Sequence, residues 1–238
     1  MRTYHVFKRI VDIFVSFIGI LILSPFWLLL AVWIKLSSRG PVIYKHRRVG
    51  KNEKIFDVYK FRTMVYGARL LQKKGIPNEK LITSAGKLMR KTFLDETLQL
   101  LNVLKGDISL VGPRPFDKEE FQKGYTIRNF PKLREVIRIK PGMTSLDSIS
   151  NYLDLEDRKR FEKKFKGLLK IDKYIESTHK YNVWSKNYKY VPGHHRYSLD
   201  SYYIENESLL LDLKIIFYTI LIMFKRIIYK RERERKTI

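Results

Sequence analysis

The feature that most constrains this chain is a long apolar segment near its N-terminus. Residues 10–36 read IVDIFVSFIGILILSPFWLLLAVWIKL. This is longer than the run of about 20 apolar residues that crosses a bilayer as a helix. It is also too long for the apolar core of a cleavable signal peptide, and no small-residue cleavage site follows it. The sequence therefore predicts a membrane anchor.

Basic residues flank the segment on both sides, namely Arg2, Lys8 and Arg9 before it and Lys35, Arg39, Lys45, Arg47 and Arg48 after it. Because flanking lysine and arginine favour the cytoplasmic side, both ends are expected there. Ser24 and Pro25 lie at the middle, where proline removes a helical hydrogen bond and serine can bond the preceding turn. The pattern predicts a re-entrant, broken helix over residues 1–39. A simple kinked transmembrane helix is the alternative.

The charge balance of the chain calls for an anionic partner. The sequence contains 48 Lys and Arg against 24 Asp and Glu, a net charge of +24. Nucleic acid, anionic lipid head groups and phosphorylated substrates all fit that charge, and the membrane segment favours the last two. The chain has no cysteine, which excludes disulfides, thiolate metal sites and cysteine nucleophiles.

A second informative stretch covers residues 87–115, KLMRKTFLDETLQLLNVLKGDISLVGPRP. Thr92 followed by Asp95 is typical of a capping box, and apolar residues then recur at helical spacing until Gly106. This predicts a helix with Asp95 and Glu96 in its first turn. Free backbone N–H groups at such a helix start favour anions, so a phosphate can approach there with a divalent cation between it and the carboxylates.

Basic residues surround this acidic pair in the sequence. Arg90 and Lys91 precede it, and Arg114 follows within Gly112-Pro113-Arg114-Pro115, where two prolines fix the backbone. A guanidinium held in this way loses little freedom on binding phosphate. Acidic residues are also common in first helical turns for purely structural reasons, so the pair alone does not identify a catalytic site.

A β-hairpin is expected between the apolar segment and the acidic pair. Residues 42–44 and 55–61 have the composition of short strands around a turn at residues 50–52. On the second strand, two-residue alternation places Lys60 and Arg62 on one face, side by side.

Four motifs together resemble the bacterial sugar transferase family, the monotopic phosphoglycosyl transferases. They are GPVIYKHRRVGK at residues 40–51, YKFRTM at 59–64, the stretch at 87–115 and IKPGMT at 139–144. The resemblance implies transfer of a sugar 1-phosphate from a UDP-sugar to a polyprenyl phosphate such as undecaprenyl phosphate. This reaction would be the first membrane step in assembling an exopolysaccharide, O-antigen, capsule or glycoprotein glycan.

The resemblance also implies roles for individual residues. Asp95 would be the nucleophile that forms a phosphosugar-aspartate, and Glu96 would help hold Mg²⁺ with Asp95 or act as a base. Ser24-Pro25 would be the break in the membrane helix. The substrate phosphates would be bound by four cations: Lys60, Arg62, Arg90 and Arg114.

The resemblance covers residues 1–145 and 198–225. Two positions depart from the usual pattern: Leu98 where many members have proline, and Ser145 where glycine is usual. The expected fold is α+β and mainly helical, in five parts: a re-entrant anchor (1–39), a catalytic core (40–145), a charged, Tyr-rich insertion (146–197), an amphipathic interfacial helix (198–230) and a charged tail (231–238).

These inferences define the expected partners and one alternative class. The expected partners are a UDP-sugar, polyprenyl phosphate, Mg²⁺ and anionic membrane lipids, at the cytoplasmic face of the cell membrane, with no nucleic acid. The alternative is a membrane-bound basic scaffold, or a protein that binds nucleic acid or acidic lipid without catalysis. Such binding would weaken steeply with salt, and it would not require the acidic pair with its spaced cations.

Overall fold

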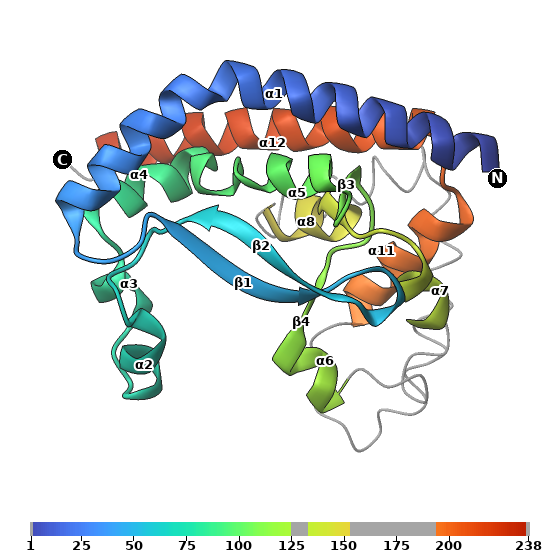
Figure 1. Cartoon of the computed structure of the whole chain (residues 1–238). Coiled ribbons are helices and arrows are strands. Elements are labelled where there is room, and N and C mark those ends of the chain that lie inside the picture. The colour runs from blue at the N-terminus through green and yellow to red at the C-terminus, as the bar shows by residue number, and fades with distance from the viewer. Residues whose placement is uncertain (1, 125–132, 153–193, 237–238) are drawn as a thin grey trace. The chain divides into compact units, whose positions relative to one another are not determined.

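The computed structural model describes residues 2–124, 133–152 and 194–236 of the chain (Figure 1). The chain is mainly helical with a small antiparallel sheet, as the sequence predicts. It forms two compact units. The first contains residues 1–48, 55–107 and 223–238, and the second contains residues 49–54 and 108–222.

The first unit begins with a helix, a hairpin and short helical elements: α1 (Arg2–Ser37), β1 (Ile43–Val49), β2 (Ile55–Phe61), α2 (Ala68–Lys73), α3 (Asn78–Leu81), α4 (Ser84–Thr92), the 3₁₀ turn η2 (Leu94–Glu96) and α5 (Gln99–Lys105). The elements of the second unit are the 3₁₀ turn η1 (Lys51–Glu53), β3 (Ser109–Val111), β4 (Phe116–Asp117), α6 (Lys118–Gly124), α7 (Leu133–Arg138), β5 (Gly142–Thr144), α8 (Leu146–Tyr152) and α11 (His194–Glu205). The last helix, α12 (Leu209–Lys236), starts in the second unit.

Helix α1 is one continuous helix through Ser24 and Pro25. Proline at position 25 has no N–H to give to the carbonyl of Leu21, and the Ser24 hydroxyl donates to that carbonyl instead, at 3.0 Å. This substitution explains how the helix continues past the proline. The helix is arched rather than straight (Figure 1), and the structure describes no two-helix hairpin in this segment.

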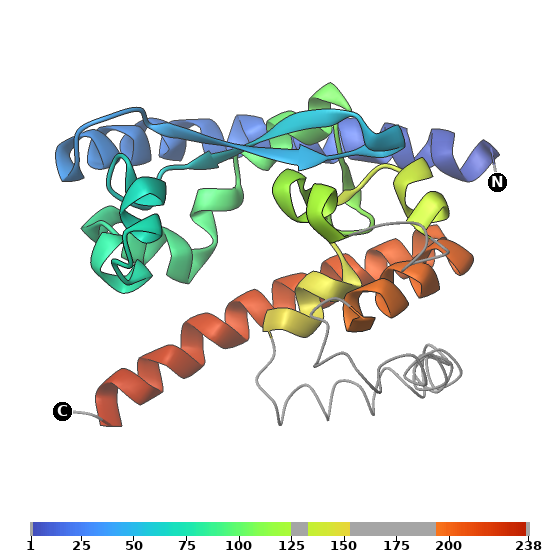
Figure 2. The same cartoon turned by 90° about the horizontal axis from the view of Figure 1, so that it is seen from below.

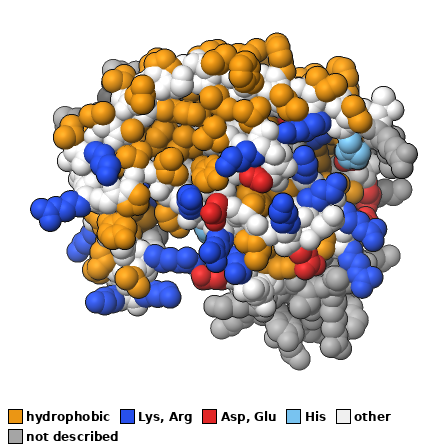
Figure 3. All heavy atoms as spheres, viewed as in Figure 1, with side chains coloured by type: hydrophobic (Ala, Val, Ile, Leu, Met, Phe, Trp, Pro, Cys, Tyr) orange, Lys and Arg blue, Asp and Glu red, His pale blue; other side chains and the backbone are white. Residues whose placement is uncertain are grey.

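Large apolar side chains are exposed along most of the length of α1. Thr3–Ser37 is the only helix in the described part of the chain that is long and apolar enough to cross a membrane, and 11% of its most apolar window is buried. Figure 3 shows hydrophobic side chains gathered over this helix. The exposed set runs along its length and includes Phe7, Phe14, Phe17, Leu21, Ile22, Phe26, Leu28, Leu29 and Leu36. An unassociated soluble protein rarely exposes a contiguous apolar surface of this kind.

Helix α5 lies between α1 and the hairpin, and contacts both (Figure 1). The core of this unit contains residues from α1, β2, α4 and the N-cap of α5: Leu30, Ile34, Phe61, Ala85, Met89 and Leu98. Asn102 of α5 is fully buried. Its amide accepts from the Tyr59 N–H at 3.0 Å and donates to the Asp57 carbonyl at 2.7 Å, which fixes the position of α5 along β2.

The hairpin predicted after the apolar segment is confirmed. Strand β1 is longer than predicted, and the strands β1 and β2 are neighbours in the sheet. The turn is closed by Gly50, whose N–H donates to the Lys54 carbonyl at 2.9 Å. Seen from below, β1 and β2 run as one twisted ribbon (Figure 2).

The second unit is built on a short parallel pair of strands. Strands β3 and β5 pair with Ser109 opposite Gly142 and Val111 opposite Thr144. A Cβ on Gly142 would lie 2.1 Å from the backbone nitrogen of Gly112, so the close approach of these two strands requires glycine. The main core of this unit joins β3 to α8, α11 and α12 through Val111, Leu146, Ile149, Leu199, Tyr202, Tyr203, Leu211, Ile215 and Ile222.

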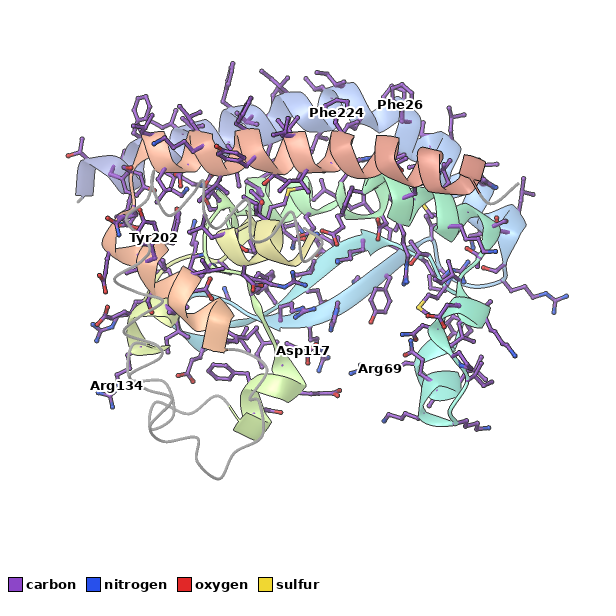
Figure 4. All side chains as sticks on the ribbon, turned by 180° about the vertical axis from the view of Figure 1, so that it is seen from behind. Phe26, Arg69, Asp117, Arg134, Tyr202 and Phe224 are labelled. Carbon is purple, nitrogen blue, oxygen red and sulfur yellow. The ribbon has the colours of Figure 1, made fainter. Side chains whose placement is uncertain are left out.

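The C-terminal segment, predicted as one amphipathic helix, forms the two helices α11 and α12. Helix α12 buries Leu211, Ile215 and Ile222. Another stripe of large apolar side chains stays exposed, with Leu210, Leu213, Phe217, Ile220, Leu221 and Phe224 at helical spacing. Figure 4 labels Phe224 on this helix and Phe26 on α1. Most of the predicted insertion, residues 153–193, lies outside the described residues.

Candidate active site

The acidic pair lies in a short 3₁₀ turn between two helices of the first unit. Asp95 and Glu96 belong to η2, and α5 begins three residues after Glu96. The prediction that Thr92 caps this helix is wrong. Thr92 is the last residue of α4, and its hydroxyl donates to the carbonyls of Leu88 and Met89. The chain turns at Phe93, which has a left-handed backbone (φ 59°, ψ 14°) and separates α4 from η2.

The carboxylate of Glu96 is held at both oxygens. Lys60 Nζ lies 2.7 Å from Oε1, and Gln99 Nε2 donates to Oε2 at 3.0 Å. Gln99 is itself buried. Sequence reasoning missed this residue, although its spacing of three from Glu96 at a helix start is a signal for such a contact.

Asp95 differs from its neighbour. Within the part of the chain that the structure describes, this carboxylate forms no ion pair with a side chain. Burial raises the pKa of Asp95, and the negative charge of Glu96 raises it further. The nearby charges of Lys60 and Arg90 and a backbone hydrogen bond offset part of that rise. A carboxylate that is poorly stabilised by its surroundings is a reactive nucleophile, because attack relieves its charge.

Arg90 comes from the last turn of α4. Its Nε donates to the Thr63 hydroxyl at 2.8 Å, which holds the guanidinium beside the end of β2. Its positive charge lowers the pKa of Asp95. The structure therefore brings Lys60, Arg90, Asp95 and Glu96 together, from three elements of one unit.

Arg62 has a different environment from Lys60. Strand β2 ends at Phe61, so the alternation that would place Lys60 and Arg62 side by side does not continue through Arg62. The buried guanidinium of Arg62 donates to the carbonyls of Ser38 and Arg39, just past the end of α1. Burial lowers the pKa of Arg62. The structure thus gives Arg62 a contact that fixes the exit of α1.

Arg114 belongs to the second unit. Its Nε lies 4.0 Å from Oδ2 of Asp147, and its side chain is 39% exposed. Asp147 is buried in the first turn of α8. This pairing leaves part of the guanidinium accessible and restrains the rest.

The acidic pair has the donor set of a simple magnesium site. No group of three or more His, Cys, Asp or Glu side chains that could hold a metal occurs within residues 2–124, 133–152 and 194–236. Mg²⁺ usually takes one or two carboxylates together with substrate phosphates and water, and not an all-protein cage. Asp95 and Glu96 fit that pattern.

The charges around Asp95 predict how its titration responds to Lys60. Replacing Lys60 with methionine removes a charge that lowers the pKa of Asp95, so this pKa rises further above its ordinary range. If the ionised form of Asp95 reacts, the acid limb of the pH–rate profile moves to higher pH. For the transfer from a UDP-sugar that the sequence motifs imply, the pH profile of single-turnover UMP release measures this shift. Lys91→Met, a change next to Arg90 in sequence, is the control and should leave the limb in place. An acid limb unchanged by Lys60→Met would contradict this assignment.

Comparisons with known proteins show the family of this chain. The family model described as "Bacterial sugar transferase" matches residues 3–184. The undecaprenyl-phosphate galactose phosphotransferase of Salmonella typhimurium is 37% identical over 180 residues, covering 68% of this chain and 36% of that protein. The UDP-glucose:undecaprenyl-phosphate glucose-1-phosphate transferase of Klebsiella pneumoniae is 34% identical, covering 90% of this chain and 39% of that protein.

A relative of similar length is the exopolysaccharide production protein PSS of Rhizobium leguminosarum bv. phaseoli. It is 34% identical over 220 residues, which cover 90% of this chain and 94% of that protein. The chain spans little more than a third of the length of the Salmonella and Klebsiella relatives. The match over residues 3–184 includes the hairpin, the acidic pair and both of the cations brought beside it, and it shows that this chain belongs to the bacterial sugar transferase family.

Proposed function

We propose that this protein transfers a sugar 1-phosphate from a UDP-sugar to a polyprenyl phosphate, yielding a polyprenyl-diphosphate sugar and UMP. The observation that carries the proposal is the asymmetry of the acidic pair. Glu96 is held by Lys60 and Gln99, whereas Asp95 is half-buried with a raised pKa. The names of the relatives support the two substrates, because they include undecaprenyl-phosphate phosphotransferases and a transferase that uses UDP-glucose.

The proposed reaction has two displacements at one phosphorus. An oxygen of Asp95 attacks the phosphorus that bears the sugar, and the bond from that phosphorus to the bridging oxygen breaks, so UMP leaves with the electron pair. A phosphate oxygen of the polyprenyl phosphate then attacks the same phosphorus. The diphosphate bond forms and the Asp95 carboxylate is released. Division into two steps lets one site treat two substrates in turn.

The reaction brings several negative charges together, and cations must offset them. Lys60 and Arg90 are placed to do so, since their charges already act on Asp95. Arg62 and Arg114 stay proposed phosphate contacts on the grounds of the family motifs. Mg²⁺, held by Asp95 and Glu96, would supply further charge neutralisation at the diphosphate. With both Glu96 oxygens already accepting a hydrogen bond, only their remaining lone pairs are available for a metal.

Helix α1 would hold this site at the cytoplasmic face of the cell membrane. Its exposed apolar side chains support immersion in lipid, and its basic flanks favour keeping both ends on the cytoplasmic side. An arched, re-entrant path satisfies both conditions. The exposed stripe of α12 would lie in the interface, where basic residues after it meet anionic head groups.

The re-entrant path predicts an effect of Pro25. Replacement by alanine restores a donor for the Leu21 carbonyl and removes the steric bend, which favours a straight span. The chain has no native cysteine, so a single cysteine placed at Thr3 reports the side of the membrane on which the N-terminus lies. Labelling with a membrane-impermeant reagent in intact cells should be absent in the otherwise native protein and present with Pro25→Ala. An N-terminus that stays inaccessible in Pro25→Ala would show that the proline does not decide the topology.

The function is tested by supplying both substrates. Purified protein in detergent with Mg²⁺, undecaprenyl phosphate and a panel of UDP-sugars should release UMP and form a lipid-linked diphosphate sugar with at least one donor. The relatives' names include galactose, glucose and N-acetylgalactosamine transfer, so those three donors come first. Absence of both products with every donor, from protein that is folded and membrane-associated in cells, would favour the scaffold alternative.

A further inference from the structure

A hydrogen-bonded chain joins the membrane helix to the turn that carries the acidic pair. The indole Nε1 of Trp27, in α1, donates to the hydroxyl of Thr97 at 2.9 Å. That hydroxyl in turn donates to the carbonyl of Leu94 at 2.8 Å. A threonine hydroxyl has one hydrogen and two lone pairs, so both contacts can be made at once. These two hydrogen bonds therefore connect Trp27 to both sides of η2, the turn formed by Leu94, Asp95 and Glu96.

The position of Trp27 along α1 is significant. It lies two residues after Pro25, and its ring packs edge-on against Phe61 at 6.4 Å between centroids. Phe61 ends β2, next to Lys60. Trp27 thus touches both elements that supply the charged pair, η2 with Glu96 and β2 with Lys60.

Two other contacts fix α5 along α1. The guanidinium of Arg9 donates to the carbonyls of Val103 and Leu104, at 2.6 and 2.8 Å, in the last turn of α5. Between these ends, Gly19 approaches Leu100 so closely that a Cβ would lie 2.9 Å from a methyl of that leucine. Helices α1 and α5 are therefore joined at both ends of α5, and the Trp27 contact lies at the end next to the acidic pair.

We propose that Trp27, acting through Thr97, is a positioning residue for Asp95. The inference rests on the proposed function. The membrane helix then does more than anchor the protein, because the N–H of Trp27 sets the geometry of the 3₁₀ turn from which Asp95 attacks. A displacement of about 1 Å at a reacting group can cost roughly a hundredfold in rate, so loss of this contact should lower the rate of the first step.

The hydrogen bond from Trp27 to Thr97 can be removed without changing the packing of the two side chains. Such variants distinguish a positioning role from a packing role. Trp27→Phe keeps an aromatic ring against Phe61 but removes the N–H. Thr97→Val keeps the volume and shape of the side chain but removes the hydroxyl that accepts from Trp27 and donates to Leu94. Thr97→Ser retains the hydroxyl. Trp33→Phe is the matched control, since Trp33 lies on the same helix and is 37% exposed.

The test measures single-turnover UMP release at saturating UDP-sugar, without lipid acceptor, together with KM for the donor and the thermal unfolding midpoint. Thr97→Val and Trp27→Phe should each slow release about tenfold or more, with KM for the donor unchanged. Thr97→Ser and Trp33→Phe should keep the native rate. Both variants break the same hydrogen bond, from Trp27 to Thr97. The double variant should therefore be no slower than the slower of the two single variants.

Other outcomes would overturn the inference. Native rates of UMP release in Trp27→Phe and Thr97→Val would contradict it. A Thr97→Ser variant as slow as Thr97→Val would also contradict it, and so would fully additive effects in the double variant. If Thr97→Val does not fold, the comparison of Trp27→Phe with Trp33→Phe decides the matter alone. Failure of the native protein to release UMP from any donor would instead reject the proposed function, so the two failures are distinguishable.

Discussion

Replacing Asp95 with asparagine is expected to abolish turnover while leaving membrane association unchanged. The amide keeps the shape of the side chain but cannot act as the nucleophile at phosphorus. UMP release and lipid-product formation should fall at least a thousandfold, to the limit of detection, on the order of other losses of a catalytic nucleophile. Fractionation of cell membranes checks the anchoring. Turnover that survives, or a variant that leaves the membrane, would mean that Asp95 is a structural residue.

The same substitution should make the folded protein more stable at neutral pH. The raised pKa of Asp95 means that the folded state holds this proton more tightly than the unfolded chain does. The folded protein therefore loses stability as the pH rises through the pKa that Asp95 has in the folded state. Asparagine does not ionise, so the variant does not lose this stability. The unfolding midpoint of Asp95→Asn should exceed the native one at pH 7, with the difference shrinking toward acid pH, below the ordinary pKa of aspartate. An unfolding midpoint of Asp95→Asn that does not exceed the native one at pH 7 would contradict the raised pKa of Asp95.

Replacing Gly86 with alanine is expected to destabilise the first unit strongly. A Cβ at this position would lie 1.9 Å from the backbone carbonyl oxygen of Thr63. The added methyl group fits only if α4 moves away from the end of β2. That carbonyl also accepts from Thr83 at 3.0 Å. We expect a loss of about 3 kcal/mol in unfolding free energy, measured by denaturant unfolding in detergent.

Gly19→Ala is the matched control for Gly86→Ala. Both glycines lie in helices and both changes improve helix propensity. The new Cβ at position 19 meets the end of the Leu100 side chain, at 2.9 Å, which can rotate. This variant should therefore stay within about 1 kcal/mol of the native protein. A Gly86→Ala variant as stable as Gly19→Ala would contradict the packing of α4 on the end of β2.

Features carried by local pattern were predictable from the sequence. The apolar run predicts α1, and the spacing of strand residues around Gly50 predicts the hairpin. The nearness of Arg90 to the acidic pair follows from its position five residues before Asp95. Each of these inferences depends on residues close together in the chain.

Local rules failed where the backbone did something unusual. Phe93 has a left-handed backbone conformation, which glycine or asparagine ordinarily signals in a sequence. Because an aromatic residue occupies this position, the end of α4 was not predicted, and Thr92 was interpreted as the cap of the next helix. The alternation of Lys60 with Arg62 was extended one residue past the end of β2. Pro25 predicts a break in the helix, but the Ser24 hydroxyl donates to the carbonyl that the proline leaves without a donor, and the helix continues.

Long-range partners were the least accessible to sequence reasoning. Asn102 and Trp27 lie in stretches that a periodic pattern treats as ordinary helix. Asn102 bonds the backbone of a strand more than forty residues earlier, and Trp27 bonds Thr97 seventy residues later. No local spacing rule connects such positions, because the fold itself brings them together. These contacts nevertheless decide where the acidic pair lies.

The proposed reaction requires a covalent phosphosugar on Asp95, which intact-protein mass spectrometry can detect. The detergent-solubilised protein is incubated with Mg²⁺ and one UDP-sugar at a time, without lipid acceptor, beside the Asp95→Asn variant. We expect a mass gain equal to one phosphosugar with the cognate donor, absent from the variant and lost when undecaprenyl phosphate is added. The same gain in Asp95→Asn, or UMP release and lipid product from the native protein with no adduct at any time point, would contradict it.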